Sequence, residues 1–525
     1  MSSENLPEIV QPKKSWTIKL LLLVFAVVLV FNFLESRNLI ILSIPSAQTA
    51  GDAISASPPT PGIIPNKELS FLTNKSSNVT EFVSLSSIDE IEISNSTYVD
   101  NHQRKKRKKT SNGKNKAVEV LSTSDMDHLL EKNRESAMIP LWMTEVDKQM
   151  LHVKSEIENA PIITSDEQLY GPVFRNLSSF KRSYELMERM LKVYVYKDGD
   201  KPVFHQPFFV GIYASEGWFM KQMEESKHFR VDDPRKAHLF YIPFSSVKLR
   251  FSMYNPETHN NRELVNYMKS YIDLISSRYP FWNRTGGGDH FLAGCHDWAT
   301  RETEQSMKPA LRALCTSNAQ IGFEIGKDIS LPATKMFHKN HPQLNLGGMP
   351  PQNRTTLAFF AGQMHGYLRP ILVQHWKNKD PDVVISGPLP HLVSRSKRTK
   401  MNPYLYYMKN SKYCLCPRGY EVWSTRVMES LYFNCVPVLI SDNFVPPLFE
   451  VLNWSEFSVI LPETDVPRLK QVLVAIPHRR YMELARGVRE VRKHFLWNTS
   501  PVKYDLFHMI LHSVWFNRLN QMHAE

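Results

Sequence analysis

The sequence predicts an α/β fold of two Rossmann-like, doubly wound domains facing a cleft, after an N-terminal transmembrane helix and a stem. One observation is length, because 525 residues exceed what a single hydrophobic core usually supports. A second is the repeated alternation of apolar, strand-like runs with helical segments, which is typical of a parallel sheet covered on both faces. A third is one uncharged apolar run near the N-terminus, followed by a long polar region.

The apolar run covers residues 20–34, and three residues before it extend it to the length that a bilayer requires. Lysines lie before this segment and at its beginning, whereas the negative and positive charges directly after it cancel each other. The positive-inside rule therefore predicts a cytosolic tail at residues 1–16, a signal anchor at 17–34 and a lumenal remainder. A cleaved signal peptide is the alternative, which is disfavoured because no convincing small-x-small site follows directly.

Residues 35–160 are predicted to form a lumenal stem and a helical neck. The stem is rich in Ser, Thr, Asn, Pro and Lys without a sustained apolar period, and helical spacing starts near residue 125. The basic run at 104–109 is interpreted as a solvated tether, with cleavage by a basic-site protease as an alternative, and its lumenal side argues against nucleic acid. Eight N-x-S/T triplets fit a lumenal orientation; they begin at Asn74, Asn78, Asn95, Asn176, Asn283, Asn353, Asn453 and Asn498.

A first α/β domain is predicted over residues 185–345. Apolar alternation indicates strands at 191–196 and 237–242, and helical spacing covers 261–278. A further strand at 289–292 follows three glycines.

A second α/β domain is predicted over residues 346–515. Its strands are near-continuous apolar runs, which indicates a parallel sheet with ligands bound at the carboxyl ends of the strands. The predicted elements are strand 356–361, a helix from 370, strands 383–385 and 413–416, helix 424–433, strands 436–440 and 458–461, and helix 467–474.

All five cysteines fall in the second half of the chain. An odd number leaves at least one thiol unpaired within the chain in an oxidising lumen. We predict that Cys295 pairs with Cys315 and Cys414 with Cys435, which leaves Cys416 free. A zinc site is not expected, because no C-x-x-C pair occurs in the sequence.

The strongest candidate binding site lies in the segment YCLCPRGYEVWSTRVMES, residues 413–430. A strand leads through Arg418 and Gly419 into a helix whose first turns carry Arg426 and Glu429. An anion beside two arginines and a helix N-terminus is well stabilised, so we expect the arginines to bind a diphosphate and Glu429 a ribose hydroxyl pair. A structural Arg–Glu pair capping the helix is the alternative.

A second loop, AGQMHGYLR, joins the first strand of the same domain to its first helix. Gly362 and Gly366 permit close backbone approach, while His365 and Arg369 supply positive or hydrogen-bonding groups. We expect this loop to lie beside the first one and to contact the same ligand.

Three runs carry a resemblance to a known family, namely KYCLCPRGYEVWSTRVMESLYFNCVPVLISDNFVPPLFEVLNWSEFSV, GGGDHFLAGCHDW and FFAGQMHGYLRPILVQHW. Over roughly residues 185–510 the chain resembles the exostosin-type glycosyltransferases, in their plant cell-wall branch. The resemblance implies a GT-B fold, a type II Golgi topology and an inverting transferase that uses a UDP-sugar. It also implies that Arg418, Arg426 and Glu429 contact the donor.

Inversion requires one base that deprotonates the acceptor hydroxyl. Candidates are Asp289, His290, His296 and Asp297 in the acceptor-side first domain. Asp297 is favoured because it lies just past a strand, and His296 either orients it or replaces it. These residues could instead only brace the glycine turn and the strand end. Three nearby aromatic residues are candidates for stacking on sugar rings; they are Tyr213, Trp218 and Trp298.

No metal or other cofactor is expected to be required, because arginines can neutralise the leaving diphosphate. Asp-x-Asp motifs, which a metal-dependent transferase would need, occur at residues 125–127, 198–200 and 380–382. They are interpreted as parts of the neck, a turn and a loop.

The sequence thus predicts a Golgi-membrane glycosyltransferase that moves a sugar from a UDP-sugar, with UDP-xylose as the first donor to consider, to pectin or a hemicellulose. The net charge of +12 favours an acidic acceptor. The alternative is a non-catalytic subunit in a complex with other Golgi glycosyltransferases. A third hypothesis, a lectin-like protein, predicts sugar binding without UDP binding.

Overall fold

The structure is a computed structural model that describes residues 120–134, 140–257, 260–340, 342, 346–389 and 402–522. All of these belong to one compact unit. The predicted tail, signal anchor, most of the stem, the basic run and the first three glycosylation triplets lie outside the described residues. Among the helices that are described, none combines the length and the apolar character needed to cross a membrane.

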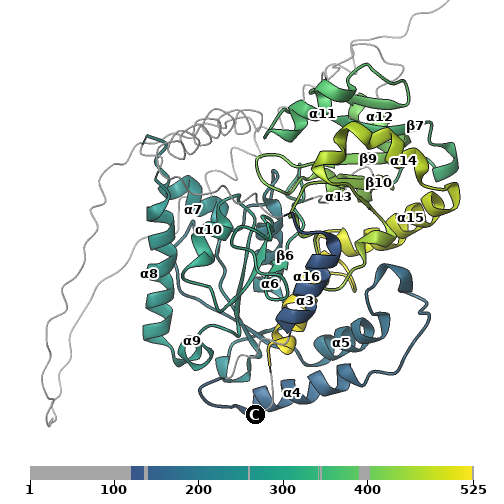
Figure 1. Cartoon of the computed structure of the whole chain (residues 1–525). Helices are drawn as coiled ribbons and strands as arrows, with labels where there is room; N and C mark the ends of the chain where they lie inside the picture. Colours follow the sequence, from purple (N-terminus) through teal and green to yellow (C-terminus); the bar gives the residue numbers. More distant parts are fainter. Residues whose placement is uncertain are drawn as a thin grey trace, which may run out of the picture. The chain divides into compact units, whose positions relative to one another are not determined.

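The first sheet has six parallel strands in the order β2-β1-β3-β4-β5-β6 (Figure 1). Its strands are β1 Val193–Val195, β2 Arg230–Val231, β3 Leu239–Tyr241, β4 His290–Gly294, β5 Leu311–Leu314 and β6 Ile329–Ser330. The predicted strands at 191–196, 237–242 and 289–292 are confirmed. Strand β5 was missed because it contains a charged residue, Arg312, whose guanidinium is paired with buried Asp328 across 2.5 Å.

Helices surround this sheet and include the predicted one at 261–278. They are α3 Thr123–Arg134, α4 Glu145–Glu158, α5 Leu177–Met190, α6 Ala214–Glu225, α7 Ser246–Met253, α8 Arg262–Arg278, α9 Pro280–Thr285 and α10 Ala299–Glu304. Helices α3 and α4 fall in the predicted neck, and their apolar faces are buried through residues such as Leu130, Met150 and Val153. The neck region is therefore packed into the folded unit.

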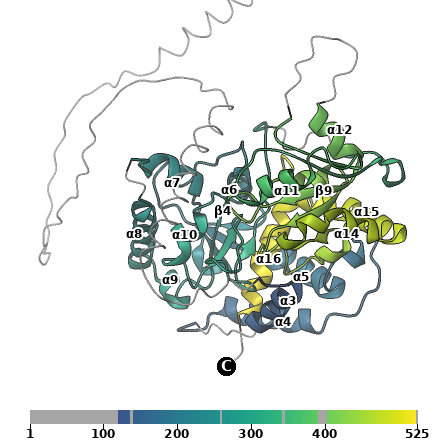
Figure 2. The same cartoon turned by 45° about the horizontal axis from the view of Figure 1, so that its top comes forward.

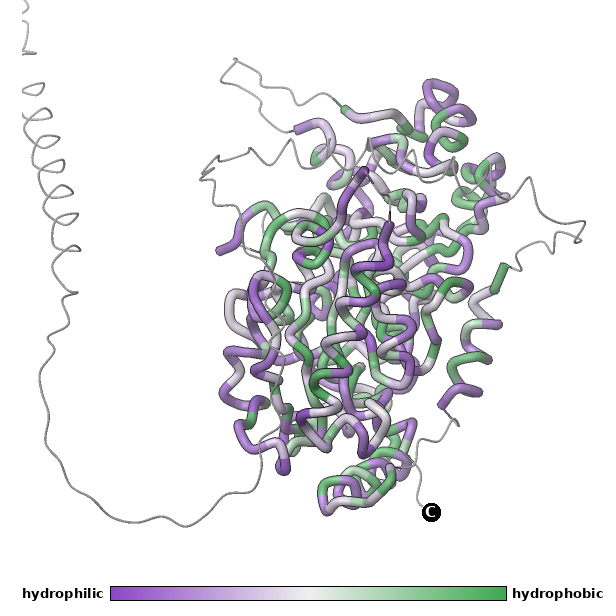
Figure 3. Tube along the Cα trace, turned by 90° about the vertical axis from the view of Figure 1, so that its left-hand side faces the viewer, coloured by the Kyte–Doolittle hydropathy of each residue, from purple (hydrophilic) through white to green (hydrophobic). Residues whose placement is uncertain are grey.

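The second sheet has five parallel strands in the order β11-β10-β9-β7-β8. Its strands are β7 Thr356–Ala361, β8 Val383–Ser386, β9 Ser411–Pro417, β10 Val436–Ile440 and β11 Val459–Ile460. The accompanying helices are α11 Leu368–Trp376, α12 Pro403–Asn410, α13 Arg426–Tyr432, α14 Leu469–Ala475 and α15 His478–Val491. Figure 3 shows apolar segments running through the interior of the unit, as expected for strands buried on both faces.

Both sheets are doubly wound. The strand order changes direction between β1 and β3 in the first sheet and between β7 and β9 in the second. Loops that leave neighbouring strands toward opposite sides of a sheet open a crevice at the carboxyl edge, which is where such folds bind ligands. The predicted mixed α/β fold with parallel sheets is confirmed, and it is consistent with a GT-B-like arrangement.

The last helix, α16 Leu506–Asn520, packs on the first sheet although it follows the second. It contacts α4, α5, β5 and β6, and Trp515 is fully buried there (Figure 1 and Figure 2). Periodicity did not single out this helix, because it is buried on all faces rather than along one stripe. The segment therefore belongs with the first sheet, whereas the sequence analysis assigned it to the second domain.

Backbone and hydroxyl groups connect the two sheets directly. Val445 N–H donates to Ser317 O at 2.9 Å, and Ser317 Oγ donates to Val445 O at 2.8 Å. Phe174 and Leu452 form an isolated antiparallel bridge. These contacts hold the carboxyl edges of the two sheets in one packed unit.

The cysteine predictions are confirmed. Cys295 pairs with Cys315, Cys414 pairs with Cys435, and Cys416 is a buried free thiol. The first disulfide joins the ends of β4 and β5, and the second joins β9 to the start of β10. The first lies beside the loop that carries His296 and Asp297.

Candidate active site

The two predicted ligand loops meet at the switch point of the second sheet. One connects β7 to α11 and contains Gly362 and His365; the other connects β9 to α13 and contains Arg418 and Gly419. Because β7 and β9 are neighbours, both loops leave the same edge of the sheet. The structure thus brings together two segments that lie more than fifty residues apart in the chain.

Glycines allow the two loops to touch. A Cβ on Gly366 would lie 2.0 Å from the carbonyl oxygen of Gly419, and the φ of Gly366 is +70°. A Cβ on Gly362 would lie 1.7 Å from an Nη atom of Arg426. A side chain on Gly366 would push the loops apart, and one on Gly362 would displace the Arg426 guanidinium.

We expect Gly366→Ala to destabilise the protein by at least about 1–2 kcal/mol, since the left-handed backbone alone costs that much for an L-residue. Gly387→Ala is the matched control, because a Cβ there meets nothing within 4 Å. Chemical denaturation measures both. Equal stability of the two variants would contradict the close packing of the loops.

Arg369 ties the two loops together. Its Nε donates to Arg418 O at 3.1 Å and its Nη1 donates to Gln363 O at 3.2 Å, and the residue is 7% exposed. Burial, followed by the nearby charge of Arg426, lowers the pKa of Arg369 to about 9. Arg369 was expected to contact the ligand, but its hydrogen bonds make it a group that positions the loops.

Arg418 is half-buried among groups that follow three different strands. Its Nη1 lies 3.6 Å from Glu463 Oε1 and 3.5 Å from Tyr367 Oη, and its guanidinium lies 5.3 Å from the Tyr367 ring centroid. Its backbone N–H donates to Ile440 O at 3.0 Å. Its Nε is buried and has no hydrogen-bond partner within the described part of the chain.

Arg426 lies at the start of α13. Its Nη2 donates to Ala361 O at 2.6 Å, and its guanidinium lies 4.7 Å from the Phe360 ring centroid. Its Nε is also buried and lacks a hydrogen-bond partner among the described residues. Each guanidinium thus has a buried donor without a partner among the described residues, and guanidinium groups bind oxygen anions through paired hydrogen bonds.

Glu429 and His365 complete this half of the site. Glu429, one turn along α13 from Arg426, accepts a hydrogen bond from Tyr404 Oη. The His365 ring stacks on Tyr420 with centroids 5.1 Å apart. All the predicted residues of the two loops therefore gather at one edge of the second sheet.

The sequence analysis missed three neighbours of these groups, Tyr367, Tyr404 and Glu463. Glu463 lies shortly after β11, and its Oε1 accepts from Asp442 N–H at 2.9 Å, directly after β10. Its place after a strand end could have identified it, as it did for Arg418. Tyr404 lies before strand β9 rather than after a strand end, so its position in the sequence does not indicate a site residue.

The acceptor-side candidates lie at the carboxyl end of β4. His296 is buried, and its Nδ1 accepts from the backbone N–H of Trp298 at 3.2 Å. In neutral His296 this bond places the proton on Nε2. Asp297 is half-buried beside it, at the edge that the sequence predicted.

Asp289 lies at the opposite, amino end of β4. Its carboxylate is 1% exposed and accepts from Arg284 Nη2 at 2.5 Å, Thr285 Oγ1 at 2.6 Å and His290 Nδ1 at 2.7 Å. Burial opposes ionisation, but the charges of His290, Arg518 and Arg284 hold the pKa of Asp289 below its ordinary value. This placement removes Asp289 from the ligand-binding edge and gives it a structural role.

Glu216 holds the loops around His296 in place. It is fully buried and accepts four hydrogen bonds, donated by Ser245 Oγ (2.6 Å), Ser246 Oγ (2.7 Å), Val247 N (3.1 Å) and Cys295 N (2.6 Å). Ser246 Oγ in turn accepts from the backbone N–H of His296 at 3.0 Å. Sequence reasoning missed Glu216 because its partners come from separate loops.

The aromatic candidates divide into two groups. Trp218 is fully buried and belongs to the core. The Tyr213 ring lies 4.9 Å from the His296 ring and 5.9 Å from that of Trp423, which follows β9. Tyr213 therefore links the carboxyl edges of the two sheets, and Trp298 is half-buried at the same edge.

Each Asp-x-Asp motif contains an aspartate that forms an ion pair with a basic side chain. Asp127 pairs with Arg175 at 2.8 Å, Asp198 pairs with Arg278, and Asp380 pairs with Lys470 at 2.6 Å. In the described ranges no group of three or more His, Cys, Asp or Glu side chains is arranged to hold a metal ion.

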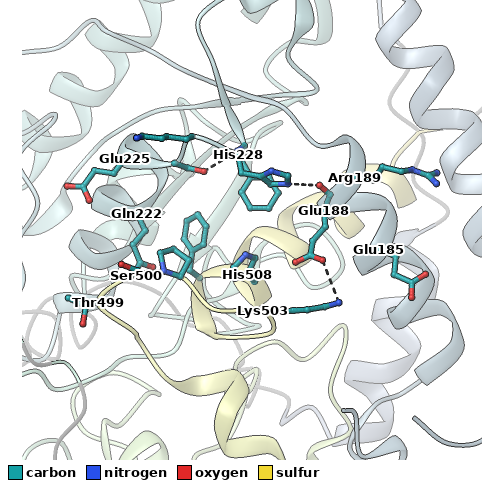
Figure 4. Close-up of a pocket in the computed structure, with 15 residues that line it drawn as sticks. Glu185, Glu188, Arg189, Gln222, Glu225, His228, Thr499, Ser500, Lys503 and His508 are labelled. Carbon is teal, nitrogen blue, oxygen red and sulfur yellow. Dashed lines mark hydrogen bonds and ion pairs between the residues drawn. The ribbon is translucent and has the colours of Figure 1, made fainter. Parts of the chain in front are cut away.

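A groove of about 880 Å³ lies elsewhere, between the ends of α5 and α6 and residues 499–508 (Figure 4). It is at the amino end of the first sheet, because β1 and β2 begin just after these helices end. One of its lysines is engaged by a carboxylate, as Lys503 Nζ lies 3.8 Å from Glu188 Oε2. We therefore do not place the candidate site there.

Comparisons with known proteins identify the family of the chain. The family described as "Exostosin GT47 domain" matches residues 187–476. "Probable glycosyltransferase At5g03795" of Arabidopsis thaliana is 40% identical over 404 residues, which is 76% of each chain. "Probable glycosyltransferase At3g07620" of the same plant is 41% identical over 370 residues, 70% of this chain and 77% of the relative.

A more distant relative is "Probable glucuronosyltransferase GUT1" of Oryza sativa subsp. japonica, which is 28% identical over 321 residues, 56% of this chain and 73% of the relative. The matched region contains both sheets and every candidate residue of the two ligand loops. The chain therefore belongs to the exostosin GT47 family of glycosyltransferases, in its plant branch.

Proposed function

We propose that this protein is an inverting glycosyltransferase that moves a sugar from a UDP-sugar to a cell-wall polysaccharide, pectin or a hemicellulose. UDP-xylose is the first donor to test, and the proposed location is the Golgi membrane, with the catalytic part in the lumen. The observation that carries the proposal is the pair Arg418 and Arg426, whose buried Nε atoms have no hydrogen-bond partner among the described residues. This pair lies at the ligand-binding edge of a doubly wound sheet.

In the donor half, the two guanidinium groups bind the diphosphate and stabilise the charge that develops as it leaves. Gly362, Gly366 and Gly419 allow the backbone to come close to the phosphates. Glu429 binds the ribose hydroxyls, and His365, fixed against Tyr420, contacts the donor beside them. The two guanidinium groups neutralise the negative charge of the leaving diphosphate, so the proposed reaction requires no added cofactor.

In the acceptor half, Asp297 is proposed as the base. It removes the proton of the acceptor hydroxyl while that oxygen attacks the anomeric carbon, and the bonding electrons leave with the diphosphate. His296 already uses Nδ1 as an acceptor, and its Nε2 carries the proton in the neutral form. It is therefore better suited to orient the acceptor or Asp297 than to replace Asp297 as base.

The names of the relatives support the reaction class, since two are named glycosyltransferases and a third a glucuronosyltransferase. The GT-B arrangement is supported by two parallel, doubly wound sheets in one packed unit. The lumenal topology rests on the charge pattern around residues 17–34.

The proposal is tested by thermal stabilisation of the purified full-length chain with a panel of UDP- and GDP-sugars in the presence of EDTA. We expect one UDP-sugar to raise the melting temperature selectively. Stabilisation by none of them, in the presence and absence of an acceptor glycan, would contradict the proposal and favour the non-catalytic subunit.

Donor binding is expected to depend on pH through Glu421. Burial raises the pKa of Glu421 to about 6, against the opposing charges of Arg418 and Arg301. A bound diphosphate adds negative charge nearby and raises this pKa further, so binding takes up a proton and tightens as pH falls through about 6. Calorimetry in buffers of different ionisation enthalpy measures the proton uptake. Glu421→Gln should abolish it, and an unchanged uptake would rule out Glu421 as its source.

A further inference from the structure

The loops at the carboxyl edge of the first sheet carry stacked pairs of cationic and aromatic side chains. The guanidinium of Arg250, on α7, lies 4.3 Å from the Tyr254 ring centroid and 5.2 Å from that of Trp298. Helix α7 follows β3 and Trp298 follows β4, so the stack joins two neighbouring strand ends. Neither the donor site nor the proposed base uses this stack.

Two further pairs extend the same edge. Lys248 Nζ lies 5.7 Å from the Phe208 ring centroid, and the Phe208 and Phe251 centroids are 6.5 Å apart. Lys335 Nζ lies 5.4 Å from the Phe337 ring centroid. Phe251 is 49% exposed and Phe337 is 59% exposed, so large aromatic faces are open to solvent.

The separate loops that carry these pairs are physically connected. Gly211, in the loop after β1, forms an antiparallel bridge with Met336, which follows β6. The ring of Trp298 lies 5.4 Å from that of His296, next to Asp297. The aromatic and cationic surface therefore begins at the proposed base and continues along the edge of the first sheet.

Within the described part of the chain, the cations of this surface contact aromatic rings and form no ion pair with a carboxylate; they are Lys248, Arg250 and Lys335. Glu302, the carboxyl group that acts electrostatically on Arg250, is 1% exposed. Burial, followed by the charge of Glu216, raises the pKa of Glu302 well above its ordinary value, against the opposing charge of Arg250.

We propose that this surface, Phe208, Lys248, Arg250, Phe251, Tyr254 and Trp298, binds an acceptor chain whose sugars carry carboxylates, namely uronic acid residues. The proposal rests on the proposed function and names the substrate class of its acceptor half. Aromatic faces stack on sugar rings, and a guanidinium held against two rings can bind a carboxylate with two parallel hydrogen bonds. A neutral glycan would use only the aromatic faces and would gain nothing from the cations.

The test compares one oligosaccharide in two forms, an α-1,4-linked galacturonic acid hexamer and its fully methyl-esterified form. The two have the same sugar rings and differ in charge. Binding to the full-length chain is measured by calorimetry at low salt. We expect the acid to bind at least about tenfold more tightly than the ester, since a hydrogen bond to a charged group contributes roughly a factor of ten or more.

Arg250→Gln should remove this preference for the acid while leaving the affinity for the ester within about twofold. Arg486→Gln is the matched control, because Arg486 also lies over a ring, 4.5 Å from the Tyr170 centroid, but on α15 of the second sheet. Arg250→Lys keeps the charge without the planar fork and should retain part of the preference. Circular dichroism shows that each variant is folded.

Equal affinity of the wild-type chain for the acid and the ester would overturn the inference, and so would equal losses in the Arg250 and Arg486 variants. Stabilisation by UDP-sugars, measured on the same preparations, separates this result from the proposed function. If the chain binds the acid selectively through Arg250 but binds no nucleotide-sugar, the glycan-binding surface is supported and the glycosyltransferase function is contradicted. If it binds a nucleotide-sugar without preferring the acid, the glycosyltransferase function is supported and the glycan-binding surface is contradicted.

Discussion

Replacing Arg418 by alanine is expected to abolish the stabilisation of this protein by its UDP-sugar while leaving the free protein nearly as stable as before. The diphosphate loses one of two guanidinium partners, and hydrogen bonds to charged groups contribute about 1.5–3 kcal/mol each, so we expect affinity to fall by roughly 10- to 100-fold. The fold should survive because the side chain lies at a loop edge, with Glu463 and Tyr367 Oη at 3.5–3.6 Å as its partners. Thermal shift and calorimetry measure both quantities.

Arg468→Ala is the control for Arg418→Ala. Arg468 is an arginine of the same half of the chain, and it pairs with Asp465 at 2.5 Å on an exposed 3-10 turn. Its loss should leave donor affinity unchanged. If the melting temperature of Arg418→Ala collapsed without ligand, Arg418 would serve mainly as the structural partner of Glu463, as in the alternative interpretation of an arginine–glutamate pair.

The donor half could be predicted from sequence because its groups follow strand ends within short, local segments. Gly419 comes two residues after the end of β9 and Arg426 comes nine residues after it, whereas Gly362 comes directly after β7. Parallel pairing of β7 with β9 then brings the two loops together without any further information. The sequence could not show that Arg369 points back onto the carbonyl groups of both loops, because that depends on side-chain direction.

The acceptor half was less predictable because its geometry depends on contacts between distant segments. Asp289 and Asp297 lie in one thirteen-residue motif, yet they end at opposite ends of the five-residue strand β4. The support of His296 comes from Glu216, about eighty residues earlier in the chain. Likewise, the packing of α16 on the first sheet is a long-range feature that hydrophobic periodicity does not encode.

Replacing Asp297 by asparagine is expected to remove sugar transfer while UDP-sugar binding stays intact. Asparagine has the same shape but cannot accept the hydroxyl proton, and a positioned base contributes typically 10²- to 10⁴-fold to the rate, so kcat should fall by roughly that factor. Donor affinity should change little, because the donor contacts come from the loops after β7 and β9 whereas Asp297 follows β4. Radiolabelled transfer to the acceptor glycan measures kcat, and calorimetry measures donor affinity.

Asp382→Asn is the control for this variant, because Asp382 is a surface carboxylate that pairs with Lys470 at 3.2 Å far along the chain from β4. It should retain normal turnover. The variant His296→Gln then distinguishes the two acceptor-side candidates. If Asp297 is the base, His296→Gln retains transfer at a reduced rate. Normal turnover by Asp297→Asn, together with loss of transfer in His296→Gln, would instead transfer the role of base to His296, whose proton would then have to move to Nδ1, releasing the bond from Trp298 N–H, so that Nε2 can accept.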